Sequence, residues 1–448
     1  MMKKIAISLV CPLISLLLTT SCLGDEAEVT ESSEVALRSF GIQDLKTTHT
    51  IQKENGEDST YTVVMTGATV QFTIDQERCL VYNNDSIPYG TDVSRVLVKV
   101  TADGGVCYFD ANGAAASIED SIDFTNPVTF QVTSYDELYA RTYLVSLNVH
   151  QVDPTKTSWK KVDAAGFPQD LFVAQKALVK GDSLFVLGID ANGACHTASA
   201  ALSNATVWNS APCTGLEGNA EGLSAVLLGD MFYLATDAGL YSSADAVAWT
   251  AVATDANVAA LLAVEGNSVW GVNGDSLVAS TDMATWEAKQ QIAKKLGRGV
   301  ASFSEPLSTN EHIMRTIFVA TPEAADTCAQ VWTKLTTNTT WVEIEPKGSN
   351  IYGCPNLENL VVLQYAGKMH AFGGKSVGNR KSPLEAFGQC YESRDNGVTW
   401  KVYDEAFSLP EEFKGRTESF SAATDGEYVW VMWGNGEVWR GRWNGLSH

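Results

Sequence analysis

One short stretch, which reads Ser-x-Asp-x-Gly-x-Thr-Trp, constrains the fold of this chain more than any other, because weaker copies of it recur through the C-terminal two thirds. The clearest copy is Ser393–Trp400. Asp and Asn side chains in such a stretch accept hydrogen bonds from the amides just beyond them and close a tight turn. Gly397 permits a positive φ, and Trp400 begins the returning strand with a large apolar face. The stretch therefore predicts a β-hairpin in which Ser393, Asp395, Gly397 and Trp400 have structural roles.

Five further segments end in a tryptophan at a comparable place. Ser280–Trp286 keeps the Ser, Asp and Trp, Ser243–Trp249 is a weaker copy, Ser203–Trp208 and Thr336–Trp341 keep the turn and the Trp, and Thr157–Trp159 keeps only the end. Successive tryptophans of this set are 37 to 59 residues apart, which suits a four-stranded blade with loops of variable length. The alternative is a β-sandwich with several Trp hairpins.

The repeated turn resembles the Asp-box of sialidase-like β-propellers. Lys368–Gly374 resembles a kelch-type second strand instead, so both labels stay open. Third strands are expected near residues 199–203, 239–243, 276–280, 330–334, 389–393 and 437–441, which makes six repeats. The last repeat stops after its third strand, and we expect Ser158–Val162 to complete it by pairing with Val438–Gly441. The sequence thus predicts a six-bladed β-propeller over residues 158–448.

The region before the propeller is also rich in β-strand signals. Between Ala36 and Val149, short alternating runs are separated by turn signals, and no run has a helical period. This pattern predicts an immunoglobulin-type sandwich over residues 35–150, joined to the propeller by a linker at 151–157. The predicted fold class is therefore all-β, with an Ig-like β-sandwich followed by a six-bladed propeller.

The first residues have the pattern of a targeting segment. Lys3 and Lys4 precede an apolar run, Ile5–Leu18, that is too short to span a bilayer. Leu18–Cys22 resembles the lipobox of bacterial lipoproteins, which implies that residues 1–22 are a signal peptide and that Cys22 is lipidated and anchors the chain to a lipid bilayer. Residues 23–34 form an acidic tether, and its start, Leu23–Glu26 with the acidic Asp25 and Glu26, resembles the surface-export signal of Bacteroidetes lipoproteins. The alternatives are an ordinary secretory signal and a generic acidic tether.

Taken together, these segments resemble a Bacteroidetes-type family of surface lipoproteins of unknown function, with an N-terminal Ig-like domain and a C-terminal propeller. The residues that carry the resemblance in the first domain are Ile74–Gln76, Asn83–Val93, Asp123–Val132 and Tyr143–Val145. The resemblance implies a fold and a location at the outer membrane, on the cell surface, and it implies no activity.

Composition and motifs exclude several function classes. The chain has 31 Lys and Arg against 53 Asp and Glu, a net charge of −22, and a surface that acidic repels nucleic acid. The six His are scattered, so no metal site is expected, and no phosphate-binding or dinucleotide-binding loop implies a cofactor. The F/Y-R-I-P motif of sialidases does not occur, and the predicted propeller has only seven Arg from which an arginine triad could be drawn. We therefore name no catalytic residue.

The cysteines suggest two structural pairs. Cys195 and Cys213 flank a predicted hairpin symmetrically, and Cys328 and Cys354 flank the corresponding hairpin of the fourth repeat. Both pairs are disulfide candidates in an oxidising compartment. A pair between Cys79 and Cys107 is a further option. The alternative is that all remaining cysteines are reduced and simply fill space.

Two functions stay open. The first is a binding or scaffold protein for a glycan or protein ligand, and the second is a divergent carbohydrate-active enzyme with its site in the propeller mouth. Carboxylates about 5–10 Å apart at the mouth would favour the enzyme. For binding, the sequence points to the long insertion Lys375–Gly388, where Lys375, Arg380 and Lys381 form a cationic cluster on an acidic protein. The alternative is a solvated loop whose charges balance nearby acids.

Overall fold

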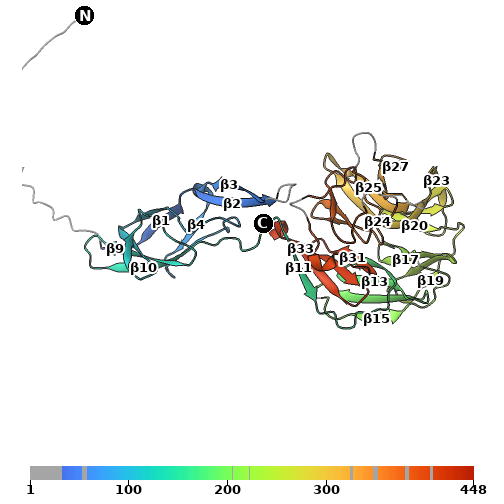
Figure 1. The fold of residues 1–448 in the computed structure, drawn as a ribbon, viewed down its shortest axis with the longest axis horizontal. Coiled ribbons are helices and arrows are strands. Elements are labelled where there is room, and N and C mark those ends of the chain that lie inside the picture. The colour runs from blue at the N-terminus through green and yellow to red at the C-terminus, as the bar shows by residue number, and fades with distance from the viewer. Residues whose placement is uncertain are drawn as a thin grey trace, which may run out of the picture. The chain divides into compact units, whose positions relative to one another are not determined.

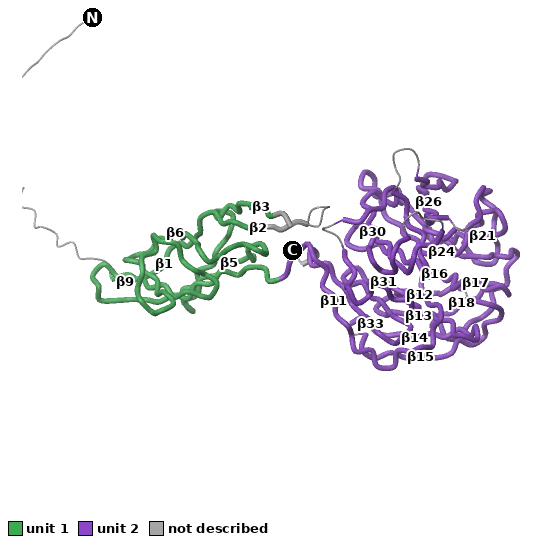
Figure 2. The backbone as a smooth tube through the Cα atoms, viewed as in Figure 1, with its two compact units in different colours: residues 1–151 green, residues 152–448 purple. Residues whose placement is uncertain are grey.

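The computed structural model divides the chain into two compact units, residues 1–151 and 152–448 (Figure 1 and Figure 2). It describes residues 33–52, 58–203, 205–220, 222–322, 326–346, 352–378, 383–403 and 407–447. The predicted signal peptide and most of the acidic tether, with Cys22, lie outside these ranges. In the described part, no helix is both long enough and apolar enough to cross a membrane.

Unit 1 is built from strands and one short 3-10 helix. Its elements are β1 (Leu37–Ile42), β2 (Leu45–Gln52), β3 (Asp58–Met65), η1 (Gly67–Thr69), β4 (Phe72–Asp75), β5 (Leu80–Asn83), β6 (Val98–Ala102), β7 (Gly104–Phe109), β8 (Ala115–Ser117), β9 (Val128–Ser134) and β10 (Ala140–Ser146). Six of the strands form one sheet in the order β4-β5-β10-β9-β7-β8, in which only the β5–β10 pair is parallel. The pairs β1–β6 and β2–β3 form two further antiparallel ladders.

The core of unit 1 lies between the six-stranded sheet and the β1–β6 ladder. Strand β9 alternates buried and half-buried residues, as expected for a strand with one face on a core. From that face Phe130 meets Phe40 of β1 edge to face, with ring centroids 5.8 Å apart. The all-β prediction for this unit is confirmed, whereas its Ig-type topology stays a prediction.

Unit 2 consists of short strands with two 3-10 helices near its end. Its elements are β11 (Thr157–Val162), β12 (Ala174–Lys180), β13 (Ser183–Ile189), β14 (Cys195–Ala201), β15 (Asn209–Pro212), β16 (Ser224–Leu228), β17 (Met231–Thr236), β18 (Gly239–Ser243), β19 (Thr250–Ala251), β20 (Ala260–Glu265), β21 (Ser268–Asn273), β22 (Ser276–Ser280), β23 (Glu287–Gln291), β24 (Leu296–Leu307), β25 (Asn310–Pro322), β26 (Gln330–Leu335), β27 (Val342–Glu343), β28 (Val361–Tyr365), β29 (Lys368–Phe372), β30 (Tyr391–Ser393), η2 (Glu411–Phe413), β31 (Phe420–Thr424), β32 (Val429–Trp433), β33 (Val438–Trp443) and η3 (Asn444–Ser447).

Among the described residues, the strands of unit 2 form six antiparallel sheets. Five have four strands, and the sheet β28-β29-β30 has three. In each sheet we call the strand that begins the repeat its first strand, which gives β31, β12, β16, β20, β24 and β28. These first strands neighbour one another in that order in a closed cycle that returns from β28 to β31. Figure 2 shows β12, β16, β24 and β31 near the middle of the unit. In this cycle β12 and β24 are three sheets apart and therefore lie on opposite sides.

One of the six sheets joins the two ends of the unit. Strand β11, the first of unit 2, pairs antiparallel with β33, the last, from Thr157↔Trp443 to Val162↔Val438. The expected pairing of residues 158–162 with 438–441 is therefore present. Trp159 of β11 packs edge to face on Phe407 and Phe413 and donates its indole N–H to the carbonyl of Ser408 at 2.7 Å. The joint thus has side-chain contacts as well as a hydrogen-bonded ladder.

The recurrent turn has one geometry in several sheets. In Ser393–Trp400, Asp395 accepts hydrogen bonds from the Ser393 hydroxyl and the Thr399 amide, and the indole of Trp400 donates to the carbonyl of Gly397 at 3.0 Å. The same indole bond, to the carbonyl three residues earlier, is made by Trp208, Trp249 and Trp286.

The copies without Gly also place a residue with a positive φ three positions before the Trp. Gly397 has φ 87°, and its counterparts Ala246 and Met283, which likewise accept the indole bond, have φ 61° and 65°. The buried indole and the Asp hydrogen bonds hold these residues in a conformation that L-residues rarely adopt. The Gly is therefore useful but not required.

Candidate functional site

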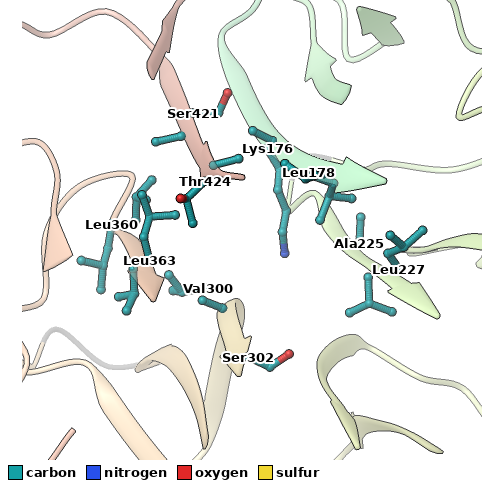
Figure 3. Close-up of a pocket in the computed structure, with 18 of the residues that line it drawn as sticks. Lys176, Leu178, Ala225, Leu227, Val300, Ser302, Leu360, Leu363, Ser421 and Thr424 are labelled. Atoms are coloured by element: carbon teal, nitrogen blue, oxygen red, sulfur yellow. The ribbon is translucent and has the colours of Figure 1, made fainter. Parts of the chain in front are cut away.

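A cavity of about 420 Å³ lies on the axis of unit 2, and each of the six sheets contributes its first strand to the wall (Figure 3). Side chains from β12, β16, β20, β24, β28 and β31 line it. A ring of twisted sheets leaves such a channel because the inner strands cannot pack against one another across the axis. We call this cavity the channel.

Two cations lie in the channel, Lys176 from β12 and Arg298 from β24. Figure 3 shows the Lys176 side chain extending from its strand into the space between Thr424, Val300 and Ala225. Its Nζ reaches to 3.4 Å from the carbonyl of Gly299, next to Arg298 in sequence. Since β12 and β24 belong to opposite sheets, the lysine spans the channel and approaches the arginine.

The surroundings of these cations are poorly solvated. Burial and, to a smaller extent, the positive charge of Arg298 together lower the pKa of Lys176 to about 7. Burial lowers the pKa of Arg298 as well. Among the described residues, the guanidinium of Arg298 has no hydrogen-bond partner, although its backbone amide donates to the hydroxyl of Thr321 at 2.9 Å.

The rest of the described lining is apolar with a few hydroxyl and amide groups. The apolar part includes Leu178, Leu227, Leu262, Val300 and Leu363. The polar part is Gln175, Asn359, Ser302, Ser304, Ser421 and Thr424. No carboxylate, imidazole, thiol or phenol of the described chain lines the channel. In the same residues, no group of three or more His, Cys, Asp or Glu is placed to hold a metal ion.

The cations lie near one end of the channel. Lys176 and Arg298 are each the third residue of their strands. We call this end, where the first strands begin, the mouth. Leu178 and Val300 each follow one of these cations by two residues on the same strand and so lie deeper, which gives the channel a cationic mouth and an apolar interior.

The insertion singled out from the sequence begins at the mouth. Lys375 is exposed, and its carbonyl accepts from the amide of Glu358, immediately before the channel residues Asn359 and Leu360. Residues 379–382 lie outside the described part, so the structure places neither Arg380 nor Lys381. The predicted binding role of Lys375, Arg380 and Lys381 stays a prediction.

The disulfide candidates lie close together in space. The amide of Cys213 donates to the carbonyl of Cys195 at 2.8 Å, and the amide of Ala329, beside Cys328, donates to the carbonyl of Cys354 at 2.9 Å. None of the seven described cysteines is joined in a disulfide in this structure. The contact between the two thiols raises the pKa of Cys195 and lowers that of Cys213. Oxidation of either pair stays a prediction.

Sequence reasoning missed the two channel cations, because Lys176 and Arg298 are far apart in the chain and belong to no motif. A weak signal was present: Ala174–Lys180 is the first strand of its repeat, and a lysine in such a strand faces the axis or a neighbouring sheet. The sequence alone does not show which of the two it faces.

Distant solved structures resemble this chain. Virginiamycin B lyase from Staphylococcus aureus is 11% identical, with a TM-score of 0.36, over 64% of this chain and 99% of that one. A DUF4623 family protein from Bacteroides eggerthii is 9% identical, with a TM-score of 0.34, over 91% and 98%. The SapL1 lectin, solved with alpha methyl fucoside, is 14% identical, with a TM-score of 0.37, over 61% and 90%. Likenesses this distant carry no argument about function. No curated protein matches the sequence.

Family models match both units. Residues 40–147 match the DUF6242 N-terminal domain, a domain of unknown function, and residues 153–448 match the DUF6242 beta propeller domain. The second match alone spans more than half of the chain. With its all-β first unit and its ring of sheets around an axial channel, this protein belongs to the DUF6242 family.

Proposed function

We propose that this protein is a lipid-anchored binding module of the outer membrane, exposed on the cell surface, that captures its ligand in the channel of a six-bladed propeller. Cys22 carries the lipid, and an Ig-like first unit serves as a spacer. The ligand is a glycan or a segment of another protein, or a small molecule derived from one of them. The loop that begins at Lys375 contributes to the rim of the site.

The composition of the channel wall carries this proposal. A cavity of about 420 Å³ is within the usual size range of ligand pockets, and its wall combines apolar surface with a few polar groups. Glycoside hydrolysis needs a pair of carboxyl groups flanking the scissile bond. The described wall offers no such pair, so the channel is equipped to bind rather than to hydrolyse. The alternative of a divergent carbohydrate-active enzyme has no comparable support.

Narrowing the channel tests where the ligand binds. The soluble form, residues 23–448, is applied to a glycan array and to a hydrolase screen, and we expect binding without product. Leu178→Trp fills part of the channel from β12 and should abolish that binding while the melting temperature changes little. Val173→Trp, at a position 58% exposed and outside the strand, is the matched control. Binding that survives Leu178→Trp would place the ligand elsewhere.

The anchor is tested separately in cells. Cys22→Ala should abolish incorporation of labelled fatty acid and release the chain from the membrane fraction, since several acyl chains are needed for stable anchoring. Exchange of Asp25 and Glu26 for Ala should lower accessibility to added protease if they direct surface export. Persisting fatty-acid labelling of Cys22→Ala would show that another residue carries the lipid.

A further inference from the structure

We infer that the channel recognises an amphiphilic organic anion, with its anionic head between Lys176 and Arg298 and its apolar body along the deeper wall. The inference rests on the proposed function, because it concerns the same site; among the ligands named there, it favours a protein segment or a small molecule over an unmodified glycan. It states that the ligand carries a carboxylate, sulfonate or sulfate group on a body of low polarity.

The two cations are positioned to share one anionic group. They come from opposite sheets of the ring, and the Lys176 ammonium reaches to 3.4 Å from the carbonyl of the residue next to Arg298. An anionic head at the mouth would therefore have an ammonium on one side and a guanidinium on the other. A guanidinium presents paired donors that match the two oxygens of a carboxylate or sulfonate group.

Other enclosed cations in unit 2 already have protein carboxylates. Lys334 Nζ lies 2.6 Å from Glu265 Oε1, Lys368 Nζ lies 3.2 Å from Glu392 Oε1, and Arg416 lies 2.5 Å from Glu437 Oε2. In a chain with 53 acidic residues, carboxylates are abundant. The described channel wall nevertheless places none beside Lys176 or Arg298. This arrangement favours an external anion as their partner.

Holding two cations close together in a poorly solvated channel opposes folding. Desolvation and mutual repulsion disfavour the charged form of Lys176, in line with its lowered pKa. An anion bound between the two cations relieves both effects, because it restores the lost solvation and screens the repulsion. The feature that costs stability in the free protein therefore becomes a source of affinity in the complex.

The deeper wall sets the chemistry of the rest of the ligand. Leu178 and Val300, two residues beyond the cations on β12 and β24, contribute aliphatic surface there. The hydroxyls there are partly occupied: Thr424 donates to the carbonyl of Tyr428 at 2.8 Å, and Ser304 lies 2.9 Å from the hydroxyl of Thr316. A polyhydroxylated acid would leave many hydroxyl groups without partners, whereas an alkyl or aryl body would gain from burial.

Titration calorimetry with two probes of equal shape tests the inference on the soluble full-length form, residues 23–448. Octanoate carries the head and body described above, and octanamide is its neutral isostere. We expect octanoate to bind about tenfold or more tightly than octanamide, as for a charge-assisted hydrogen bond in a desolvated site. Glucuronate, an acid with a hydroxyl-rich body, should bind more weakly than octanoate.

Variants locate the effect. Lys176→Met and Arg298→Met each keep an unbranched or extended apolar stem and remove one charge, and each should abolish the preference for octanoate over octanamide. Lys160→Met, at an exposed position on the outer strand β11, makes the same change in net charge away from the channel and should leave the preference intact. A preference that survives both channel variants would overturn the assignment to Lys176 and Arg298.

The binding should depend on pH in one direction. Lys176 and Arg298 are the only charged or titratable groups that face the channel from the described parts of β12, β16, β20, β24, β28 and β31. With the Lys176 pKa at about 7, the ammonium is present below that value and is lost above it. The affinity for octanoate should therefore fall as the pH rises from 6 to 8, and Lys176→Met should remove this dependence.

The outcomes separate the inference from the proposed function. If octanamide binds as tightly as octanoate, the anion inference is wrong and channel binding stands. If neither probe binds but array ligands bind in a manner sensitive to Leu178→Trp, the ligand class is wrong and the function stands. If nothing binds in the channel, both proposals fail.

Discussion

Two groups of enclosed charge in unit 2 differ in how they are compensated. In the sheet β28-β29-β30, the carboxylate of Glu392 is 1% exposed and lies against Lys368 and Arg394. His370, beside it, is held neutral because burial lowers its pKa to about 4. In the channel, Lys176 and Arg298 face each other without a described carboxylate.

The difference teaches which charges the fold needs. A carboxylate buried as deeply as Glu392 persists only with cations at hand, so its partners complete the packing of the sheet. The channel cations form no ion pair with a described carboxylate, and Lys176 reaches only the carbonyl of Gly299. A buried charge without a protein counter-ion lowers the stability of the fold and is a reason to look for a ligand. A buried charge that is paired within the protein gives no such reason.

The largest expected effect comes from breaking the compensated group. Glu392→Gln keeps the shape of the side chain but leaves Lys368 and Arg394 without their shared carboxylate. We expect the free energy of unfolding to fall by about 3–4 kcal/mol, as for other broken buried pairs. Chemical denaturation checks this.

An exposed ion pair supplies the control for that variant. Glu427 lies 3.5 Å from Arg442, and its side chain is 57% exposed. Glu427→Gln should cost about 0.5 kcal/mol or less. Equal losses for the two variants would contradict the contrast between buried and exposed pairs.

In the channel, by contrast, removing a charge should increase the free energy of unfolding. Lys176→Met replaces a strained cation by an apolar side chain and should raise the free energy of unfolding by about 2 kcal/mol at pH 6. The folded-state pKa of Lys176 is about 7, below the unfolded value of about 10.4. The penalty is therefore complete below pH 7 and shrinks between pH 7 and 10. Denaturation curves at pH 6 and 9 should show a larger gain at pH 6, and a loss at both would show that the ammonium stabilises the fold.

The smallest effect is expected for a carboxylate that serves only a turn. Asp395 is exposed and accepts bonds from the Ser393 hydroxyl and the Thr399 amide. Asp395→Ala should lower the melting temperature by about 2 °C, because the indole bond of Trp400 and its burial still hold the turn. A drop as large as that of Glu392→Gln would show that the turn nucleates the sheet.

Local chemistry made much of unit 2 predictable. Eight consecutive residues are enough to predict the turn around Trp400, and the incomplete last repeat predicted the pairing of β11 with β33. Strands β18 and β22 have the bounds expected of them, 239–243 and 276–280. In each case the signal lies in residues that are neighbours in the chain or in a counted period.

Outer strands were less predictable. The strand that returns after Trp400 is reduced to one bridge between Glu392 and Lys401, and the strand that returns after Trp249 is only Thr250–Ala251. An outer strand has a neighbour on one side only, so its length depends on loops that no local pattern fixes. The sequence did not predict the pair of channel cations for a related reason, since only the curvature of the ring brings Lys176 and Arg298 together.

The pairing of β11 with β33 has a consequence for biosynthesis. Thr157 and Trp443 are paired but 286 residues apart in the chain. Strand β11 is therefore synthesised long before its partner β33 and cannot pair until β33 has been made. Contacts between such distant segments form slowly, because a long loop must close first. Until Trp443 has been synthesised, the growing unit remains an open arc with two unpaired edges, and a chain truncated near its end would be the form most exposed to proteolysis.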